Sequence, residues 1–232
     1  MGQTKGYTKS EVLQIVKNKP LYQMSCVNWR GKTVKNEKDC GGEYYSEIIA
    51  ESVLKDELLL NCPRGEIRDS FKFSKHDGNT ENNDSMRKEE RFCLDCYKNR
   101  DTKPSPFGRI INYQVNIFKG TKINVDLVAY DEDSDTLWLI EVKGHDGESD
   151  ETLLRCVLEV ETYYRCLQPH SKTLLTTLSS KDEEVRTTEN TKIKKGIWVP
   201  EGSRAKQDFD GLENRPNLSA LIQRWGIRVE TY

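Results

Sequence analysis

The stretch LWLIEVKGHDG, residues 137–147, combines a strongly apolar run with two opposite charges. Residues 137–140 are all apolar and lead into Glu141, Val142 and Lys143, after which the chain turns polar. Such a run predicts a buried strand, in which an unpaired charge would be costly. Strand side chains alternate between faces, so we expect Glu141 and Lys143 on one face and Val142 on the other. The two charges therefore predict a functional site at the end of this strand.

The residues before this strand predict the first arm of a β-hairpin. Residues 122–130 are rich in β-branched side chains, and the acidic segment 131–135 is expected to form the turn. In an antiparallel hairpin with this turn, the end of the second strand lies beside the start of the first, where Asp126 is found. We therefore expect Asp126, Glu141 and Lys143 to converge.

Two converging carboxylates favour a hard divalent cation, Mg²⁺ or Mn²⁺. Such an ion lowers the pKa of a bound water, and Lys143 would position that water or neutralise charge on a phosphate group. This combination is typical of phosphodiester hydrolysis. The competing interpretations are an ion pair at the solvent boundary for Glu141 and Lys143, and a carboxylate that accepts backbone hydrogen bonds for Asp126.

Asp126, a gap of fourteen residues and then Glu141-Val142-Lys143 resembles the PD-(D/E)xK nuclease superfamily. The resemblance covers roughly residues 42–178. It implies an α/β protein with the restriction-endonuclease-like fold, a mixed β-sheet flanked by helices. It also implies that Asp126, Glu141 and the backbone carbonyl of Val142 hold the metal.

The same resemblance implies further site residues. The family places a Glu on the helix before the first core strand. Here that residue would be Glu47, as an auxiliary metal ligand acting through water, with Glu43 and Glu51 as competitors for the role. Some branches carry a QhxxY motif on the helix after the ExK strand, where h is hydrophobic. The segment from Glu159 to Tyr163 fits its spacing, with Glu in place of Gln, and makes both residues candidates for substrate contact, although aromatic residues at helical spacing more often belong to the core.

His145 follows the ExK strand closely and is a third candidate for substrate contact or proton transfer. A histidine in a loop is more often simply polar. Backbone contacts to nucleic acid would come from basic residues spread along the chain: Lys119, Lys122, Arg155, Arg165, Lys172, Lys192, Lys194 and Lys195.

Periodicity along the chain predicts one α/β domain. We expect a domain at 42–232, preceded by a helix and polar lead-in at 1–41 and interrupted by an exposed polar insertion at about 62–106. Predicted helices cover 8–18, 42–60, 150–167 and the first part of 217–232. Predicted strands cover 108–118, 122–130, 136–144, 172–178, 194–200 and the last residues of the chain. Charged loops are expected at 179–192 and 201–215.

Composition limits the partners of the protein. Of its 232 residues, 32% are charged and 35% hydrophobic, yet the net charge is only −2, which excludes a uniformly basic nucleic-acid binder. Neither a membrane-length apolar run of roughly 18 residues nor a signal-peptide core is visible, so we expect a soluble, intracellular protein without a membrane partner.

Seven cysteines form an odd, scattered set that favours reduced thiols. Cys93 and Cys96 make one CxxC pair. A structural Zn²⁺ there would need further ligands, such as Cys26, Cys40 or Cys62, so incidental thiols are the preferred interpretation.

The leading hypothesis is a Mg²⁺-dependent nuclease, with DNA favoured over RNA as substrate. The alternative is a nucleic-acid-binding or scaffold module on the same fold, inactive alone or working in a larger complex. Many proteins that share this resemblance act as dimers, so a homodimer or a protein partner is compatible with either function.

Overall fold

The computed structural model describes residues 6–17, 21–37, 40–62, 88–103, 105–116, 119, 124–143, 151–181 and 185–232. Its α-helices are α1 (Lys9–Val16), α2 (Tyr45–Lys55), α3 (Lys88–Lys98), α4 (Leu153–Leu167), α5 (Ser171–Lys181), α6 (Arg204–Asp210) and α7 (Pro216–Trp225). Its strands are β1 (Arg109–Asn116), β2 (Asn124–Asp131), β3 (Thr136–Val142), β4 (Lys192–Val199) and β5 (Ile227–Thr231). Short 3₁₀ turns include η1 (Leu21–Gln23), η2 (Ser25–Asn28), η3 (Glu57–Leu60), η5 (Gln168–His170) and η6 (Leu212–Asn214).

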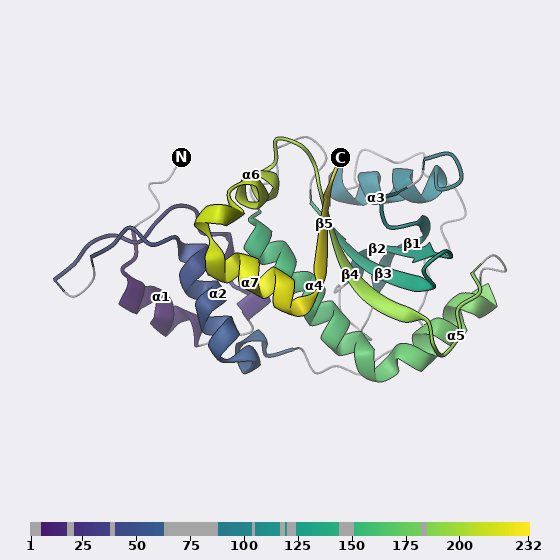
Figure 1. Ribbon diagram of the computed structural model, residues 1–232, viewed down its shortest axis with the longest axis horizontal. Helices are drawn as coiled ribbons and strands as arrows, with labels where there is room; N and C mark the ends of the chain where they lie inside the picture. Colours follow the sequence, from purple (N-terminus) through teal and green to yellow (C-terminus); the bar gives the residue numbers. More distant parts are fainter. Residues whose placement is uncertain are drawn as a thin grey trace.

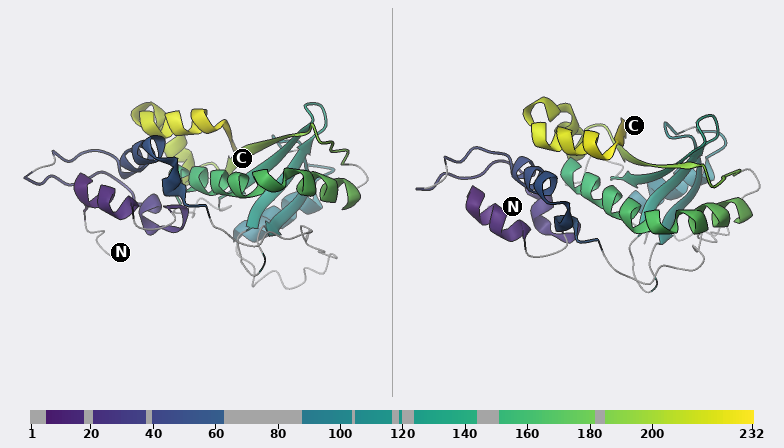
Figure 2. Two further views of the ribbon diagram at one scale, coloured as in Figure 1. Left: turned by 90° about the horizontal axis from the view of Figure 1, so that it is seen from below. Right: turned by 60° about the horizontal axis from the view of Figure 1, so that its bottom comes forward.

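The strands form one mixed sheet in the order β1-β2-β3-β4-β5. β1, β2 and β3 are an antiparallel meander, whereas β4 and β5 continue the sheet parallel to β3. The long helix α4 follows β3 and crosses one face of the sheet before the chain returns to β4 (Figures 1 and 2). The expected α/β class, with a mixed sheet between helices, is confirmed.

β3 is the central strand, and all seven of its residues are buried. Leu137 and Leu139 pack with side chains of α4 and α5, while Trp138 and Ile140 pack on the other face with Cys93 of α3. The run that looked buried in the sequence is therefore covered by helices on both sides. Glu141 and Lys143 continue the α4 face.

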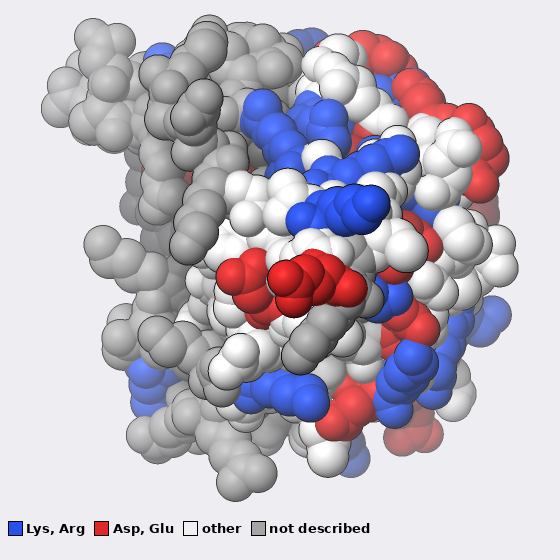
Figure 3. Space-filling view, turned by 90° about the vertical axis from the view of Figure 1, so that its left-hand side faces the viewer, with Lys and Arg blue, Asp and Glu red and all other residues white. Residues whose placement is uncertain are grey.

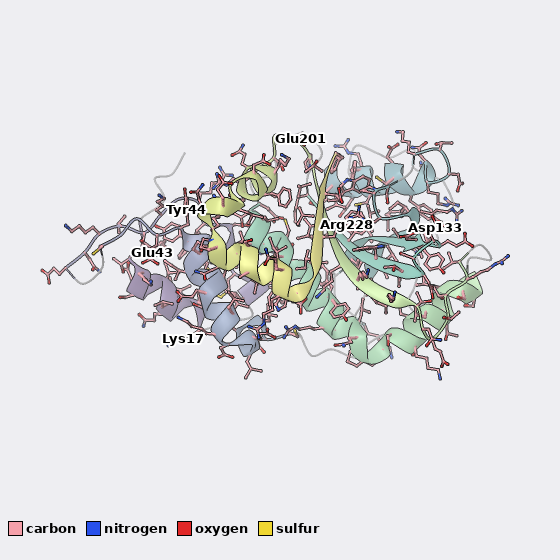
Figure 4. All side chains as sticks on the ribbon, in the orientation of Figure 1. Lys17, Glu43, Tyr44, Asp133, Glu201 and Arg228 are labelled. Atoms are coloured by element: carbon pink, nitrogen blue, oxygen red, sulfur yellow. The ribbon has the colours of Figure 1, made fainter. Side chains whose placement is uncertain are left out.

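The helices α1, α2 and α7 share a second core with the first half of α4. They occupy the other half of the molecule from the β2–β3 turn, as Glu43 and Tyr44 beside α2 and Asp133 in that turn show (Figure 4). Because β3 starts at that turn, its charged end points back toward the helices.

Most predicted elements are confirmed within a few residues. The exception among the strands is 172–178, which forms the helix α5. Leu174, Leu175 and Leu178 are buried together, a spacing that suits a helix. The threonines that favoured a strand are accommodated, since the Thr177 hydroxyl bonds to the carbonyl of Thr173 at 2.8 Å.

Two predicted loop regions contain helices. The segment 201–215 includes α6, which begins after Ser203, whose side chain accepts a hydrogen bond from the amide of Lys206. The segment 62–106 includes α3, whose Cys93 and Leu94 are buried against the sheet. That part of the chain is therefore not an exposed insertion, and residues 63–87 lie outside the described residues.

The surface carries mixed charge. On the face drawn in Figure 3, acidic and basic side chains are interspersed, with a group of Lys and Arg in its upper half. Within the described segments, no helix has both the length and the apolar composition needed to cross a membrane.

Candidate functional site

Asp126 meets the end of β3, as the hairpin predicted. The register pairs Leu127 with Ile140 and carries Asp126 to the point where β3 ends. Its Oδ2 accepts a hydrogen bond from the backbone amide of Val142 at 3.0 Å, and its Oδ1 accepts one from Nε2 of Gln114 at 2.9 Å. Both oxygens are thus fixed, in a side chain that is only 6% exposed.

Lys143 lies among three carboxylates. Its Nζ is 2.5 Å from Oε1 of Glu141, 2.7 Å from Oε2 of Glu151 and 3.0 Å from Oε2 of Glu159. Glu141 and Lys143 are 2% and 4% exposed. Burial of this ammonium is tolerable because opposite charges surround it on three sides. The interpretation of a solvent-boundary ion pair is therefore wrong for Glu141 and Lys143.

α4 brings Glu159 and Tyr163 to this cluster. The helix begins after Thr152, whose hydroxyl accepts from the amide of Arg155. One turn later, Nη2 of Arg155 pairs with Oε1 of Glu159 at 2.6 Å. Glu159 therefore joins the cations Arg155 and Lys143, and the helix start fixes where that bridge lies.

These side chains line a cavity of about 530 Å³. Its described lining is strongly acidic, with six carboxyl groups and two cations: Glu89, Glu90, Asp126, Glu141, Glu151, Glu159, Lys143 and Arg155. Gln114, Asn124, Tyr163, Tyr22 and Gln23 complete it. With every carboxyl ionised, the acidic groups exceed the cations by four charges, which favours the binding of a cation.

The buried charges shift one another's pKa. The pKa of Glu141 lies well above its usual range, mainly because the group is buried and secondly because of the charge of Asp126. Burial also raises the pKa of Asp126. Burial alone would lower the pKa of Lys143, but the neighbouring carboxylates, Glu141 first, raise it well above the usual value. Lys143 is therefore an ammonium at neutral pH.

Glu89 is the most titratable carboxyl near neutrality. Burial, followed by the charge of Asp126, raises its pKa to about 7. It stands in the first turn of α3, the helix that covers the other face of the sheet. α3 therefore brings a further carboxyl group to the cavity from the opposite side to α4.

Carboxyl oxygens, the atoms that hard cations prefer as ligands, line the cavity. Oε2 of Glu141 is buried and accepts no hydrogen bond from the described residues. Asp126 is held in place beside it through the amide of Val142. Among the described residues, no group of three or more His, Cys, Asp and Glu side chains is arranged so that it could hold a metal ion. Asp126, Glu141 and Glu89 are three of the carboxyl groups that line the cavity.

Glu47 lies elsewhere, and its assignment as a ligand of this site is corrected. Its two carboxylate oxygens accept the backbone amides of Asn217 and Leu218, each at 2.9 Å. It therefore caps the N-terminus of α7, where four amides lack helical partners. Glu47 is not among the described residues that line the cavity. Its competitors Glu43 and Glu51 pair with Lys9 and Lys55.

The remaining predicted site residues have different outcomes. His145 lies outside the described residues. Val142 is fully buried, and its carbonyl stays a predicted ligand. Burial raises the pKa of Cys93 well above its usual value and that of Cys96 to about 12, whereas a zinc ligand must be a thiolate. A zinc ion deprotonates its thiol ligands on binding, so a structural Zn²⁺ at this pair stays a prediction.

The sequence analysis missed several lining residues. Glu151 lies just before α4, and Tyr22 and Gln23 come from the lead-in segment. Gln114 carried a usable signal, because the amides Asn112, Gln114 and Asn116 alternate along a predicted strand. The sequence around Glu89 showed no comparable alternation of polar residues along a predicted strand or helix.

Comparison with protein-family models, with curated proteins and with solved structures found no match to this chain. The resemblance to the PD-(D/E)xK superfamily therefore rests on the motif residues alone. Of these, Asp126, Glu141, Lys143, Glu159 and Tyr163 meet in one cavity, and Glu47 does not.

Replacing Glu89 with Gln is expected to change the pH dependence of stability in metal-free protein. A carboxyl group whose pKa is raised on folding contributes stability that is complete below its unfolded pKa and is lost as the pH rises through the folded value. The folded value is about 7, so the wild type loses stability between pH 5 and 8. The free energy of unfolding of Glu89→Gln, measured in urea with a chelator, should match that of the wild type at pH 5. At pH 8 it should exceed the wild-type value by about 1–3 kcal/mol. Glu90→Gln controls for removing a charge from the same helical turn, and equal differences at both pH values would contradict the assignment.

Replacing Glu47 with Gln is expected to destabilise the fold without affecting cation binding. The amide group can accept from one of the two α7 amides but presents N–H to the other, so the free energy of unfolding should fall by about 1–3 kcal/mol. Glu51→Gln, on an exposed part of α2, is the matched control and should have little effect. Weaker Mn²⁺ binding by Glu47→Gln in calorimetry would restore Glu47 as a ligand.

Proposed function

We propose that this protein is a metal-dependent nuclease that hydrolyses phosphodiester bonds, with DNA as the favoured substrate. The supporting observation is the meeting of Asp126, Glu141 and Lys143 in one buried, acidic cavity at the end of the central strand. These are the three positions on which the resemblance to the PD-(D/E)xK superfamily rests. A mixed sheet with helices on both faces is also what its restriction-endonuclease-like fold requires.

In this proposal, Asp126 and Glu141 hold the divalent cation, and Glu89, whose pKa the charge of Asp126 helps to raise, would join them. The bound cation would supply Lewis acidity and a more acidic water. The protein supplies the positions of the carboxylates, which burial and the amide of Val142 fix before any ligand arrives. Water is largely excluded from Glu141, so its charge acts at low dielectric.

Lys143 acts as a fixed positive charge. Its raised pKa keeps it protonated, so it cannot serve as a general base at neutral pH. An ammonium in this position would instead neutralise the negative charge that develops on the phosphate oxygens. Arg155 lines the same cavity, and a second cation there would help to orient a phosphate group.

Cleavage of a mixed substrate panel tests the proposal. Supercoiled plasmid, linear duplex, single-stranded DNA and RNA would each be incubated with wild type or Asp126→Asn in Mg²⁺ or Mn²⁺. Asn keeps the size and shape of the side chain, so the fold should persist. We expect wild type to cut DNA and the variant to be slower by at least about 100-fold. Binding of DNA by both proteins with cutting by neither would favour the binding-module alternative.

Replacing Lys143 with Met should separate catalysis from cation binding. Cleavage should slow by about 100-fold or more, because the charge that neutralises the phosphate is lost. Mn²⁺ should bind at least as tightly, since the carboxylates lose their competing ammonium. Lys195→Met is the matched control, because Lys195 is also buried and pairs with Glu161 at 2.6 Å, and this burial contradicts the expected contact with nucleic acid. If both variants lose the same activity, general destabilisation explains the loss.

A further inference from the structure

Gln114 has a backbone conformation that is unusual inside a strand. Its φ is 48°, in the left-handed region that costs free energy for a residue with a side chain. Asn61 and Asp135 are the other described non-glycine residues with positive φ, and they lie at the end of η3 and in the β2–β3 turn. Asn61 ends a helical turn and Asp135 belongs to a turn between strands, whereas Gln114 lies within β1. The conformation of Gln114 therefore needs another explanation.

The strained residue faces Asp126. The pairs Tyr113–Leu127 and Val115–Val125 flank it and place Gln114 opposite Asp126 across the β1–β2 ladder. Its Nε2 donates to Oδ1 of Asp126 at 2.9 Å. Both side chains line the acidic cavity. The backbone of Gln114 is thus bent at the one position of β1 that faces the proposed metal ligand.

Two more side-chain amides, those of Asn124 and Asn116, extend this hydrogen bonding behind Gln114. Its Oε1 accepts from Nδ2 of Asn124 at 3.1 Å, and Oδ1 of Asn124 accepts from Nδ2 of Asn116 at 2.9 Å. The three side-chain amides share one direction, because each turns its NH₂ group toward the next acceptor and Asp126 is the last acceptor in the series. Gln114 turns its NH₂ group to Asp126, Asn124 turns its own to Gln114, and Asn116 turns its own to Asn124.

This chain leaves Asp126 oriented but not saturated. Among the described residues, its Oδ1 accepts a hydrogen bond from Gln114 and its Oδ2 accepts one from the amide of Val142. A carboxylate has about four acceptor positions, so capacity remains on both oxygens. Partners behind a ligand commonly fix its orientation and raise the affinity of the site.

We propose that Gln114 is a positioning residue that holds Asp126 in the orientation for binding a divalent cation, with Asn124 and Asn116 fixing the direction of its amide. The inference rests on the proposed function, because it assumes that Asp126 is a metal ligand. Gln114 itself contacts neither cation nor substrate in this role.

Calorimetric titration of Mn²⁺ into Gln114→Gly tests the inference. Glycine adopts the left-handed conformation without strain, so the backbone is retained while the amide is removed. We expect Mn²⁺ binding to weaken by about 10-fold or more, with the melting temperature of metal-free protein changed little. Gln114→Asn provides a second variant, since Asn tolerates this conformation but its amide is one methylene too short. Asn61→Gly is the control for relaxing a left-handed residue outside the site.

The outcomes separate the inference from the proposed function. Wild-type binding with a weakened Gln114→Gly and an unchanged Asn61→Gly supports the positioning role. Wild-type binding with both Gln114 variants within twofold of wild type overturns it and leaves the proposed function intact. Absence of Mn²⁺ binding by the wild type overturns the proposed function and the inference together. If Gln114→Gly does not fold, Gln114→Asn decides in the same way.

Discussion

The placement of one buried ammonium, that of Lys143, constrains the architecture around the site. β3 must be buried on both faces to hold the sheet between α3 and α4, and its last residues are buried with it. An unpaired charge there would cost several kcal/mol, so carboxylates have to lie beside the ammonium. Glu141 comes from the strand itself, Glu159 from α4 and Glu151 from just before it. The start of α4 is consequently tied to the end of β3 by charge as well as by packing.

The same constraint explains the excess of negative charge. Lys143 and Arg155 balance part of the acidic lining, and the rest must be protonated or neutralised from outside. Burial raises the pKa of Asp126 and Glu141, which shows that ionising both without a further cation is unfavourable. The metal-free site thus stores electrostatic free energy that a divalent cation could release. This is the physical link between the fold and the proposed chemistry.

Short-range patterns predicted the part of the site that lies on neighbouring strands. A period of two placed Glu141 and Lys143 on one face, and the hairpin turn brought Asp126 to them. Glu47 was assigned to the wrong site because its role depends on α7. Asn217, whose amide it accepts, lies 170 residues further along the chain, and no local pattern reveals the free amides of that helix. Glu89 was missed for a similar reason, since its polar surroundings resemble a surface loop and only packing of α3 on the sheet brings it to the cavity. Residues 172–178 were assigned to a strand because threonine favours β-structure, although three leucines at helical spacing decided the outcome.

The acidic lining also bears on how a polyanion could reach the site under the proposed function. A nucleic-acid strand approaching six carboxyl groups and two cations would be repelled at a distance comparable to the Debye length, about 8 Å at physiological salt. Cation binding removes this repulsion and creates a contact for a phosphate oxygen, so metal and substrate should strengthen each other's binding. The described carboxylates, positioned by Val142, Gln114 and the end of β3, are fixed before either ligand binds. A site built in this way would discriminate against polyanions when no divalent cation is present.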